Sequence, residues 1–165
     1  MTDTWLSEEE WLAGMVRAYV GCSVLLTDPA DRVLLLKATY RGRWQFPGGA
    51  MDPGEGPAEC AARELREETA LVAPELRLLV VEWREPIPRQ GRNAHPAVQF
   101  MFDGGTVPAD TPLTLQADEV ADYGFFPPAQ AAPLLHPSAA DRLTRALHLR
   151  RTGGTALLRS PGYLG

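Results

Sequence analysis

The stretch GGAMDPGEGPAECAARELREETAL, Gly48 to Leu71, carries the strongest structural signal in this chain. It gathers six of the 21 acidic residues into 24 positions. Pro57 suits the first turn of a helix, because a proline there loses no intrahelical hydrogen bond. Pro74 marks the limit of that helix, since the residue before a proline avoids helical geometry. The pattern predicts a helix over residues 57–69, entered from a loop rich in glycine and proline.

Three glutamates of this predicted helix share one face. Each helical residue advances by about 100°, so Glu67 and Glu68 fall within about 60° of Glu64. A solvated surface with an Arg63 to Glu67 ion pair is the ordinary interpretation. Converging carboxylates are also the ligands that Mg²⁺ or Mn²⁺ prefers, and Mg²⁺ is commonly completed by substrate phosphates. A second, small and mostly apolar face is expected to pack on a sheet; its residues are Ala58, Ala61, Ala62, Leu65 and Thr69.

The spacing of these residues resembles the Nudix box, G-x5-E-x7-R-E-U-x-E-E-x-G-U, where U is aliphatic. Eight of its nine defined positions agree. The flanking segments VLLLKATYRGRWQFPGG and DEVADYGFFPPAQAAPLLHP are similar to that family as well, so the resemblance covers roughly residues 19–150. The matching positions are Gly49, Glu55, Arg63, Glu64, Leu65, Glu67, Glu68 and Leu71.

The resemblance implies an α+β fold: a Nudix-like α/β/α sandwich with a mixed β-sheet and the catalytic loop-helix-loop. We expect one domain over residues 1–165. Apolar runs predict strands at 19–28 and 32–40, joined by a turn at Asp28, and at 76–84 and 97–105. LTLQ (113–116) and GFFP (124–127) are candidates for short strands. The remaining expectations are helices at about 7–16, 128–135 and 138–151, capped by Ser7 and Ser138, and a loose tail at 152–165.

The resemblance also implies a metal-dependent pyrophosphohydrolase that cleaves a diphosphate linkage in a nucleoside diphosphate derivative by water attack at phosphorus. Its implied cofactor is Mg²⁺, with Mn²⁺ as an alternative. By similarity, Glu67 and Glu68 are metal ligands, and Glu64 is a ligand or the base that orients the water. Glu55 holds a second metal or its waters. Glu119, in the turn before a predicted strand, is a further candidate ligand or base.

Three more positions of the box have implied roles. Arg63 orients the glutamates by salt bridges. Gly48 and Gly49 let the backbone turn sharply and approach the metal and the phosphate closely. Ala70 departs from the pattern, because the family usually has glycine there for a left-handed helix end. We therefore expect the helix end to be reshaped, or the helix to continue toward Pro74.

Several aromatic and basic residues outside the box are candidates for contacts with substrate. Trp44, near the mouth of the box, is a stacking residue for a nucleotide or part of the packing. The arginines are exposed loop residues or partners of a phosphate or ribose. The substrate-binding candidates are Arg41, Arg43, Trp44, Arg84 and Arg92; Asp118 and Asp122 are alternatives to Glu119.

Composition narrows the partners and the location. A net charge of −5 disfavours sequence-independent binding to nucleic acid. No apolar run approaches the roughly 20 residues of a membrane span, and acids occupy the N-terminus where a signal peptide carries basic residues. We expect a cytoplasmic protein with a small-molecule partner, and buried free thiols at Cys22 and Cys60. Trp5 and Trp11 suggest that the first helix docks on the sheet or on a homodimer partner.

Two other functions stay open at this point. A Nudix-fold sensor would bind a nucleotide without cleaving it, although such domains usually lose the box acids. An isomerase of the isopentenyl diphosphate type would need a reactive cysteine, which the contexts of Cys22 and Cys60 do not suggest. A Walker-type loop is excluded because the only lysine, Lys37, has no glycine-rich lead.

Overall fold

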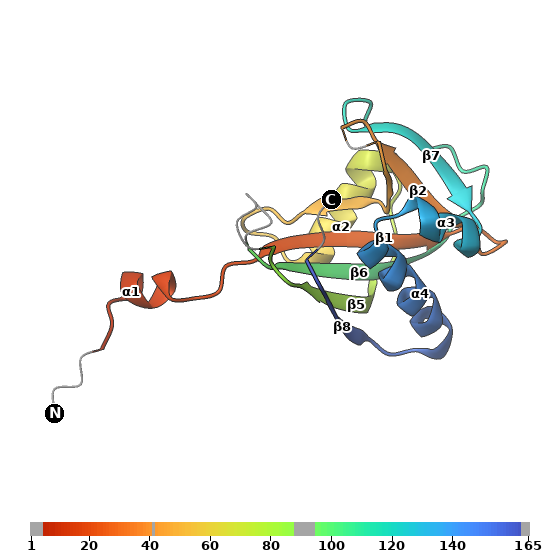
Figure 1. Cartoon of the computed structure of the whole chain (residues 1–165). Coiled ribbons are helices and arrows are strands. Elements are labelled where there is room, and N and C mark those ends of the chain that lie inside the picture. The colour runs from red at the N-terminus through yellow and green to blue at the C-terminus, as the bar shows by residue number, and fades with distance from the viewer. Residues whose placement is uncertain (1–4, 41, 88–94, 163–165) are drawn as a thin grey trace.

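The computed structural model describes residues 5–40, 42–87 and 95–162, and these form four helices and eight strands (Figure 1). The helices are α1 (Glu8–Ala13), α2 (Pro57–Thr69), α3 (Pro128–Leu134) and α4 (Pro137–Thr152). The strands are β1 (Tyr19–Thr27), β2 (Val33–Ala38), β3 (Trp44–Gln45), β4 (Gly48–Ala50), β5 (Arg77–Arg84), β6 (Ala97–Thr106), β7 (Val120–Phe126) and β8 (Ala156–Ser160).

The strands form one mixed sheet, as expected. Its order is β3-β2-β1-β6-β5-β8, with β4 paired to β1 and β7 paired to β2. The β1/β6 and β5/β8 pairs are parallel and the others are antiparallel. The predicted hairpin of β1 and β2 exists only beside its turn, where Thr27 pairs with Val33. Beyond that point β1 pairs with β4 and β6, while β2 pairs with β3 and β7, so the sheet divides into two halves.

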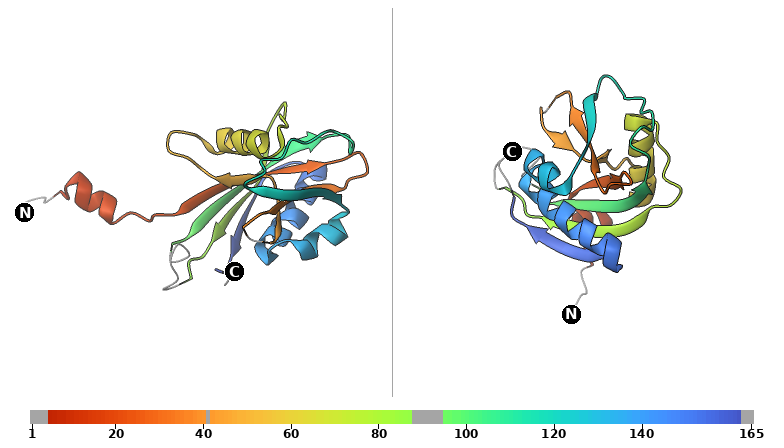
Figure 2. Two further views of the ribbon diagram at one scale, coloured as in Figure 1. Left: turned by 90° about the horizontal axis from the view of Figure 1, so that it is seen from above. Right: turned by 90° about the vertical axis from the view of Figure 1, so that its right-hand side faces the viewer.

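Helices cover both faces of the sheet, which gives the three layers of an α/β/α sandwich (Figures 1 and 2). One core lies between the sheet and α2, and includes Val24, Leu34 and Leu65. The other lies between the sheet and the α3/α4 pair, and includes Leu25 and Leu143. Because neighbouring side chains of a strand point to opposite faces, consecutive leucines such as Leu34 and Leu35 serve both cores.

Two predictions for the second half of the chain are wrong. The segment LTLQ contains no strand. The tail is not loose as far as residue 160, because Ala156–Ser160 forms β8, and Val81 and Arg84 of β5 pair with Leu157 and Ser160. The tail forms a strand because it lies along the edge of β5 that β6 does not occupy, which its own sequence does not reveal.

The helix ends differ from expectation in three places. α1 spans six residues, with the predicted capping box of Ser7 and Glu10, but it does not dock on the sheet (Figure 1). α4 is capped by His136, whose ring nitrogen accepts from the Ser138 N–H, rather than by Ser138 itself. α2 ends at Thr69 without reshaping, because Ala70 adopts the left-handed conformation at φ 60°. Within the described residues, no helix is both long and apolar enough to cross a bilayer.

Candidate active site

The site begins at the two glycines of β4. Gly48 pairs with Ser23 and Gly49 with Cys22 on β1. At Gly48, φ is +145° and a Cβ would lie 2.1 Å from the carbonyl oxygen of Cys22. At Gly49, a Cβ would lie 2.4 Å from Oε1 of Glu64. Both positions therefore need glycine, the first to approach β1 and the second to leave room for a carboxylate.

Arg63 is the centre of the cluster of acids on α2 and the preceding loop. Its Nε and Nη2 donate to the two oxygens of Glu55, at 3.0 and 2.7 Å. Its Nη1 donates to Glu64 at 2.9 Å and to Glu67 at 3.1 Å. Nη2 also donates to the carbonyl oxygen of Ala50 at 3.1 Å. One guanidinium thus contacts three carboxylates, and the salt bridges that the resemblance implied for Arg63 are present.

The electrostatics follow from this geometry. The hydrogen bonds from Arg63 are the largest cause that lowers the pKa of Glu55, to about 2. Burial raises the pKa of Glu64, against the opposing effect of Arg63, and the charges of Glu67 and Glu119 raise it further. Several carboxylates therefore compete for one internal cation. An additional positive charge at this place would be favourable.

Glu68 has a different environment from its neighbours. It is only 2% exposed, and Oε2 accepts from the Gly48 N–H at 2.7 Å. The amide nitrogen of Gln45 lies 3.5 Å from Oε1. Burial raises the pKa of Glu68 to about 7, and the charges of Glu64 and Glu119 add to that rise. The backbone turn at Gly48 therefore holds a carboxyl group that the protein keeps out of water.

The predicted division of α2 into an apolar face and a carboxylate face is only partly correct. Glu68 belongs to the packed face itself, and Ala58 and Ala62 of the predicted apolar face are exposed. The helix is rotated so that Glu64 and Glu68 point toward β4, while Glu67 lies at the solvent edge. The buried residues of α2 are Cys60, Ala61, Leu65, Glu68 and Thr69.

Glu119 lies near this cluster without touching it. The turn before β7 is hydrogen-bonded to the end of β2: the carbonyl oxygen of Glu119 accepts from the N–H of Thr39, the residue after β2, at 2.9 Å. The Glu119 carboxylate is exposed and accepts from Gln116 at 3.2 Å. Its charge acts on both Glu64 and Glu68. Asp122 instead accepts from the Tyr123 N–H on β7.

The carboxylates converge on Arg63 rather than on one another. In the part of the chain that the structure describes, no three His, Cys, Asp or Glu side chains lie close enough together to hold a metal ion. The donor chemistry nevertheless fits a hard divalent cation, because the acids offer carboxylate oxygens only. Gly49 also keeps open the space beside Glu64 that a Cβ would fill. The carboxylate side chains are suitable ligands for a divalent cation. In this structure, however, they are directed at Arg63.

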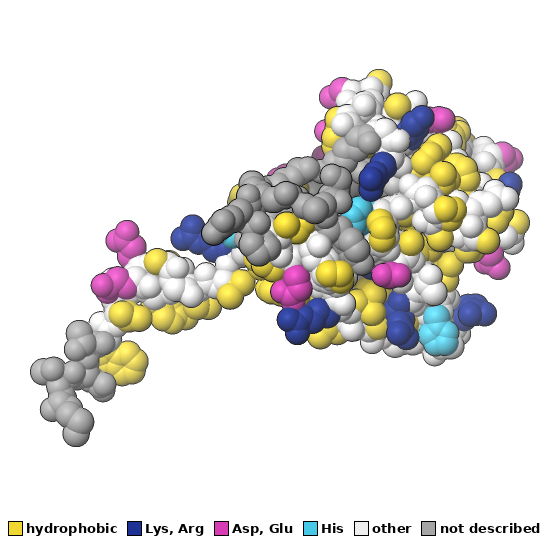
Figure 3. Space-filling view, viewed as in Figure 1, with side chains coloured by type: hydrophobic (Ala, Val, Ile, Leu, Met, Phe, Trp, Pro, Cys, Tyr) yellow, Lys and Arg dark blue, Asp and Glu magenta, His cyan; other side chains and the backbone are white. Residues whose placement is uncertain are grey.

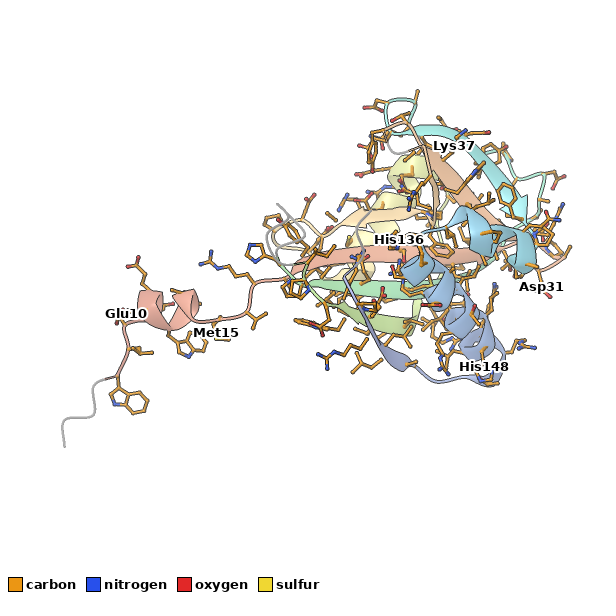
Figure 4. The ribbon with its side chains drawn as sticks, in the orientation of Figure 1. Glu10, Met15, Asp31, Lys37, His136 and His148 are labelled. Atoms are coloured by element: carbon orange, nitrogen blue, oxygen red, sulfur yellow. The ribbon has the colours of Figure 1, made fainter. Side chains whose placement is uncertain are left out.

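The substrate-binding candidates do not form one group. Arg41 and Arg92 lie outside the described residues. Trp44 packs on the α3/α4 side of the sheet, with its ring edge to face against Phe126 at 4.8 Å between centroids, which supports a packing role. His136 lies at the start of α4 (Figure 4). Burial lowers the pKa of His136, and the charges of Arg84 and Arg43 lower it further, so both arginines lie near this histidine.

Sequence reasoning missed a buried ion pair on the α4 side of the sheet. Arg142 of α4 donates to Glu82 of β5, and the Ser160 hydroxyl of β8 donates to the other oxygen of Glu82. The Glu82 side chain is 1% exposed. A charged residue at a position that faces a core was the only signal for this pair, because its members lie 60 residues apart.

The two cysteines are buried free thiols, as expected. They meet where α2 packs on β1, and burial is the largest cause that raises the pKa of both Cys22 and Cys60. A thiol with a raised pKa is a poor nucleophile at neutral pH.

Parts of this sequence are similar to curated proteins. Over 71 residues, which are 41% of this chain and 22% of the relative, it is 42% identical to the human 8-oxo-dGDP phosphatase NUDT18. It is 36% identical over 56 residues to the RNA pyrophosphohydrolase of Pseudomonas fluorescens SBW25, covering 34% of this chain and 35% of the relative. The chain thus spans about a fifth to a third of these curated relatives.

A solved structure and a family profile extend the likeness to most of the chain. The crystal structure of the MutT protein from Methanosarcina mazei Go1 has a TM-score of 0.67 and 22% identity, over 84% of this chain and 98% of that one. At that identity the likeness concerns the fold. The profile of the NUDIX domain matches residues 18–147, which include the glycine turn, α2 and Glu119. The chain therefore belongs to the Nudix domain family.

Proposed function

We propose that this protein is a pyrophosphohydrolase that cleaves a diphosphate linkage in a nucleoside diphosphate derivative with the help of Mg²⁺ or Mn²⁺. One observation carries the proposal: Glu55, Glu64 and Glu67 converge on a single arginine beside the Gly48-Gly49 turn. These three glutamates carry three negative charges, of which Arg63 balances one. An enzyme that neutralises phosphate oxygens through a bound cation needs this excess.

Each residue of the site has a part in the proposal. Glu64, Glu67 and Glu68 hold the cation, and Glu55 holds a second cation or its waters. When bound, the cation supplies charge neutralisation at the phosphate oxygens and lowers the pKa of water. Glu64 or Glu119 orients the attacking water. Arg63 is a positioning residue, because its contacts are with the carboxylates and with the carbonyl of Ala50.

The main experiment measures hydrolysis with Mg²⁺ and with Mn²⁺ over a panel of substrates. The panel contains ADP-ribose, a nucleotide sugar, a dinucleoside polyphosphate and an oxidised nucleoside triphosphate. It also contains 8-oxo-dGDP, the compound in the name of the human relative. We expect release of a nucleotide product from at least one compound. Binding of a panel member without hydrolysis would contradict the proposal and favour a sensor.

Substitution of the acids tests the mechanism. Glu67→Gln and Glu68→Gln each remove a charge with little change in shape, and we expect turnover to fall at least 100-fold, as on the loss of a group that stabilises the transition state. Glu59→Gln is the matched control on the same helix, because among the described residues Glu59 accepts from the Gly56 N–H alone, and a glutamine can do the same. Mn²⁺ binding followed by electron paramagnetic resonance should weaken in parallel. Unchanged turnover and unchanged Mn²⁺ binding would remove both glutamates from the mechanism.

The isomerase alternative has no support from the site. It needs a reactive cysteine, and the thiols of Cys22 and Cys60 are buried with raised pKa values. Neither is the thiolate that such chemistry requires.

A further inference from the structure

The N-terminal arm, residues 5–18, projects from the body of the molecule and leaves its apolar side chains in water (Figures 1 and 3). Trp5 is 86% exposed, and none of the residues of α1 is buried. Glu10 and Met15 lie on this arm, well away from the sheet (Figure 4). The exposed apolar residues of the arm are Trp5, Leu6, Trp11, Leu12, Met15 and Val16.

The arm has a defined structure that its own length does not explain. α1 has six residues, and an isolated helix shorter than about 12 residues is marginal in water. Yet Ser7 and Glu10 form a complete capping box, with the Ser7 N–H donating to Glu10 at 2.9 Å. A capped helical turn that carries Trp11 and follows Trp5 is suited to packing against another surface.

Part of the apolar sheet face beside α2 is only partly covered by the described residues. α2 packs on β1, β4 and β6, and it makes no comparable contact with the adjoining strands β5 and β8. Val81 pairs with Leu157 and Trp83 pairs with Val98, so these four side chains lie together on the α2 side. They belong to neither core; Leu157 is 77% exposed, and Val81, Trp83 and Val98 are partly buried. We call these four residues the open sheet face.

The direction in which the arm leaves β1 favours packing of the arm on a second copy of the chain over packing on its own sheet. The arm joins β1 at Tyr19, which pairs with Ala97, next to Val98 of the open sheet face. In two views the arm continues outward from β1 (Figures 1 and 2), so it would have to reverse within residues 14–18 to cover its own sheet. A partner copy related by a two-fold axis can receive the arm without that reversal.

The apolar area of the arm and the negative charge of α1 are consistent with a protein partner. The two tryptophans and four aliphatic side chains represent roughly 600 Å² of apolar surface for each arm, and a standard interface buries about 800 Å² for each partner. Each copy would bury one arm and one sheet face, which is enough for a stable dimer. Glu8, Glu9 and Glu10 oppose binding of the arm to an anionic membrane.

We propose that the arm packs on the open sheet face of a second copy of this chain, so that two copies exchange arms in a symmetric homodimer. Sedimentation and light scattering at micromolar concentration should give a dimer. Trp11→Glu on the arm and Leu157→Glu on the sheet should each raise the dissociation constant at least 100-fold. Val72→Glu is the matched control, because Val72 is an equally exposed apolar residue outside both surfaces.

Unfolding curves should show that all three variants fold, since each replaced side chain is largely exposed. A monomeric wild-type protein would overturn the proposal, as would a dimer that survives both Trp11→Glu and Leu157→Glu. Co-sedimentation of a wild-type monomer with phosphatidylcholine vesicles would overturn it in favour of a lipid surface.

A cross-link distinguishes exchange from docking within one chain. The doubly substituted protein Trp11→Cys/Leu157→Cys, oxidised with copper phenanthroline, should run as a covalent dimer on a non-reducing gel. Cys22 and Cys60 are buried, so we expect neither to react in this experiment. A compact monomer with an internal disulfide would overturn the proposal, because the arm would then cover its own sheet.

Discussion

Arg63 and Arg142 each hold glutamate side chains, on opposite faces of one sheet, and the two centres differ in their charge balance. Arg142 meets one carboxylate, Glu82, and a serine hydroxyl satisfies the second oxygen. Arg63 meets Glu55, Glu64 and Glu67. The Arg142 pair is neutral and almost entirely buried, whereas Arg63 keeps 22% of its side chain exposed.

The difference teaches how to separate a structural ion pair from a candidate active site. A neutral buried pair adds a specific contact between β5 and α4 and has no charge left for a ligand. A cluster with two surplus carboxylates and access to solvent is less favourable by itself, because the like charges repel. A bound cation therefore stabilises the folded protein most at a site where like charges repel in the metal-free protein.

Of the substitutions that test this difference between the two arginines, Arg142→Met should have the largest effect on stability. It leaves the Glu82 carboxylate buried without its cation, and we expect the free energy of unfolding to fall by about 3–5 kcal/mol. Urea unfolding followed by circular dichroism measures it. The double variant Glu82→Leu/Arg142→Met should regain most of that loss, because it removes both charges together.

The corresponding variant of the other centre, Arg63→Met, should respond to metal instead. Its three carboxylates lose their internal cation, so it should be less stable in chelator and regain stability with excess Mg²⁺. Arg142→Met should show no such recovery. If Mg²⁺ restored the stability of both variants equally, the carboxylates at Arg63 would not form a cation site that Glu82 lacks.

A third prediction concerns the pH dependence of stability, which tests the burial of Glu68 in the α2 site. Burial raises the pKa of Glu68 from 4.5 in the unfolded chain to about 7, so between these values the folded protein binds more protons than the unfolded one. The free energy of unfolding should therefore fall as pH rises from about 5 to 7, by on the order of 3 kcal/mol, and level off above. Glu64, whose pKa is also raised, acts in the same direction.

Unfolding by urea at pH 5 and pH 8 in chelator checks this slope. Glu68→Gln should flatten most of it, since the amide does not titrate. Excess Mg²⁺ should also reduce it, because a cation favours the ionised carboxylate. A wild-type protein that is equally stable at both pH values would contradict the burial of Glu68 as a protonated group.

The parts of the structure that the sequence predicted are those with local causes. Pro57 and the periodic residues after it set the bounds of α2, and Arg63 reaches partners no more than 13 residues away. The burial of Glu68 was missed because it depends on how α2 rotates against β4. That rotation is a property of the packed layers rather than of the helix sequence.

The failures involve contacts between distant segments. β8 forms because β5 presents an unpaired edge some 75 residues earlier in the chain, and Leu157 is exposed, so the strand has no alternation to detect. The Glu82 to Arg142 pair joins β5 and α4 in the same way. Docking of α1 on the sheet of its own chain was one of two expectations from Trp5 and Trp11, and the exposure of both contradicts it.

The smallest effect should come from Ala70→Gly, at the end of the helix that carries the acids. Ala70 has φ 60°, where a Cβ costs about 1–2 kcal/mol, and glycine recovers this at the expense of about 0.4–1 kcal/mol of unfolded-state entropy. The net gain in the free energy of unfolding should be about 0.5–1 kcal/mol, with hydrolysis unchanged because no carboxylate moves. Ala62→Gly, at an exposed interior position of α2, is the matched control and should lose about 1 kcal/mol. If the two variants lost stability alike, α2 would not end in a left-handed residue, and the helix would continue past Thr69.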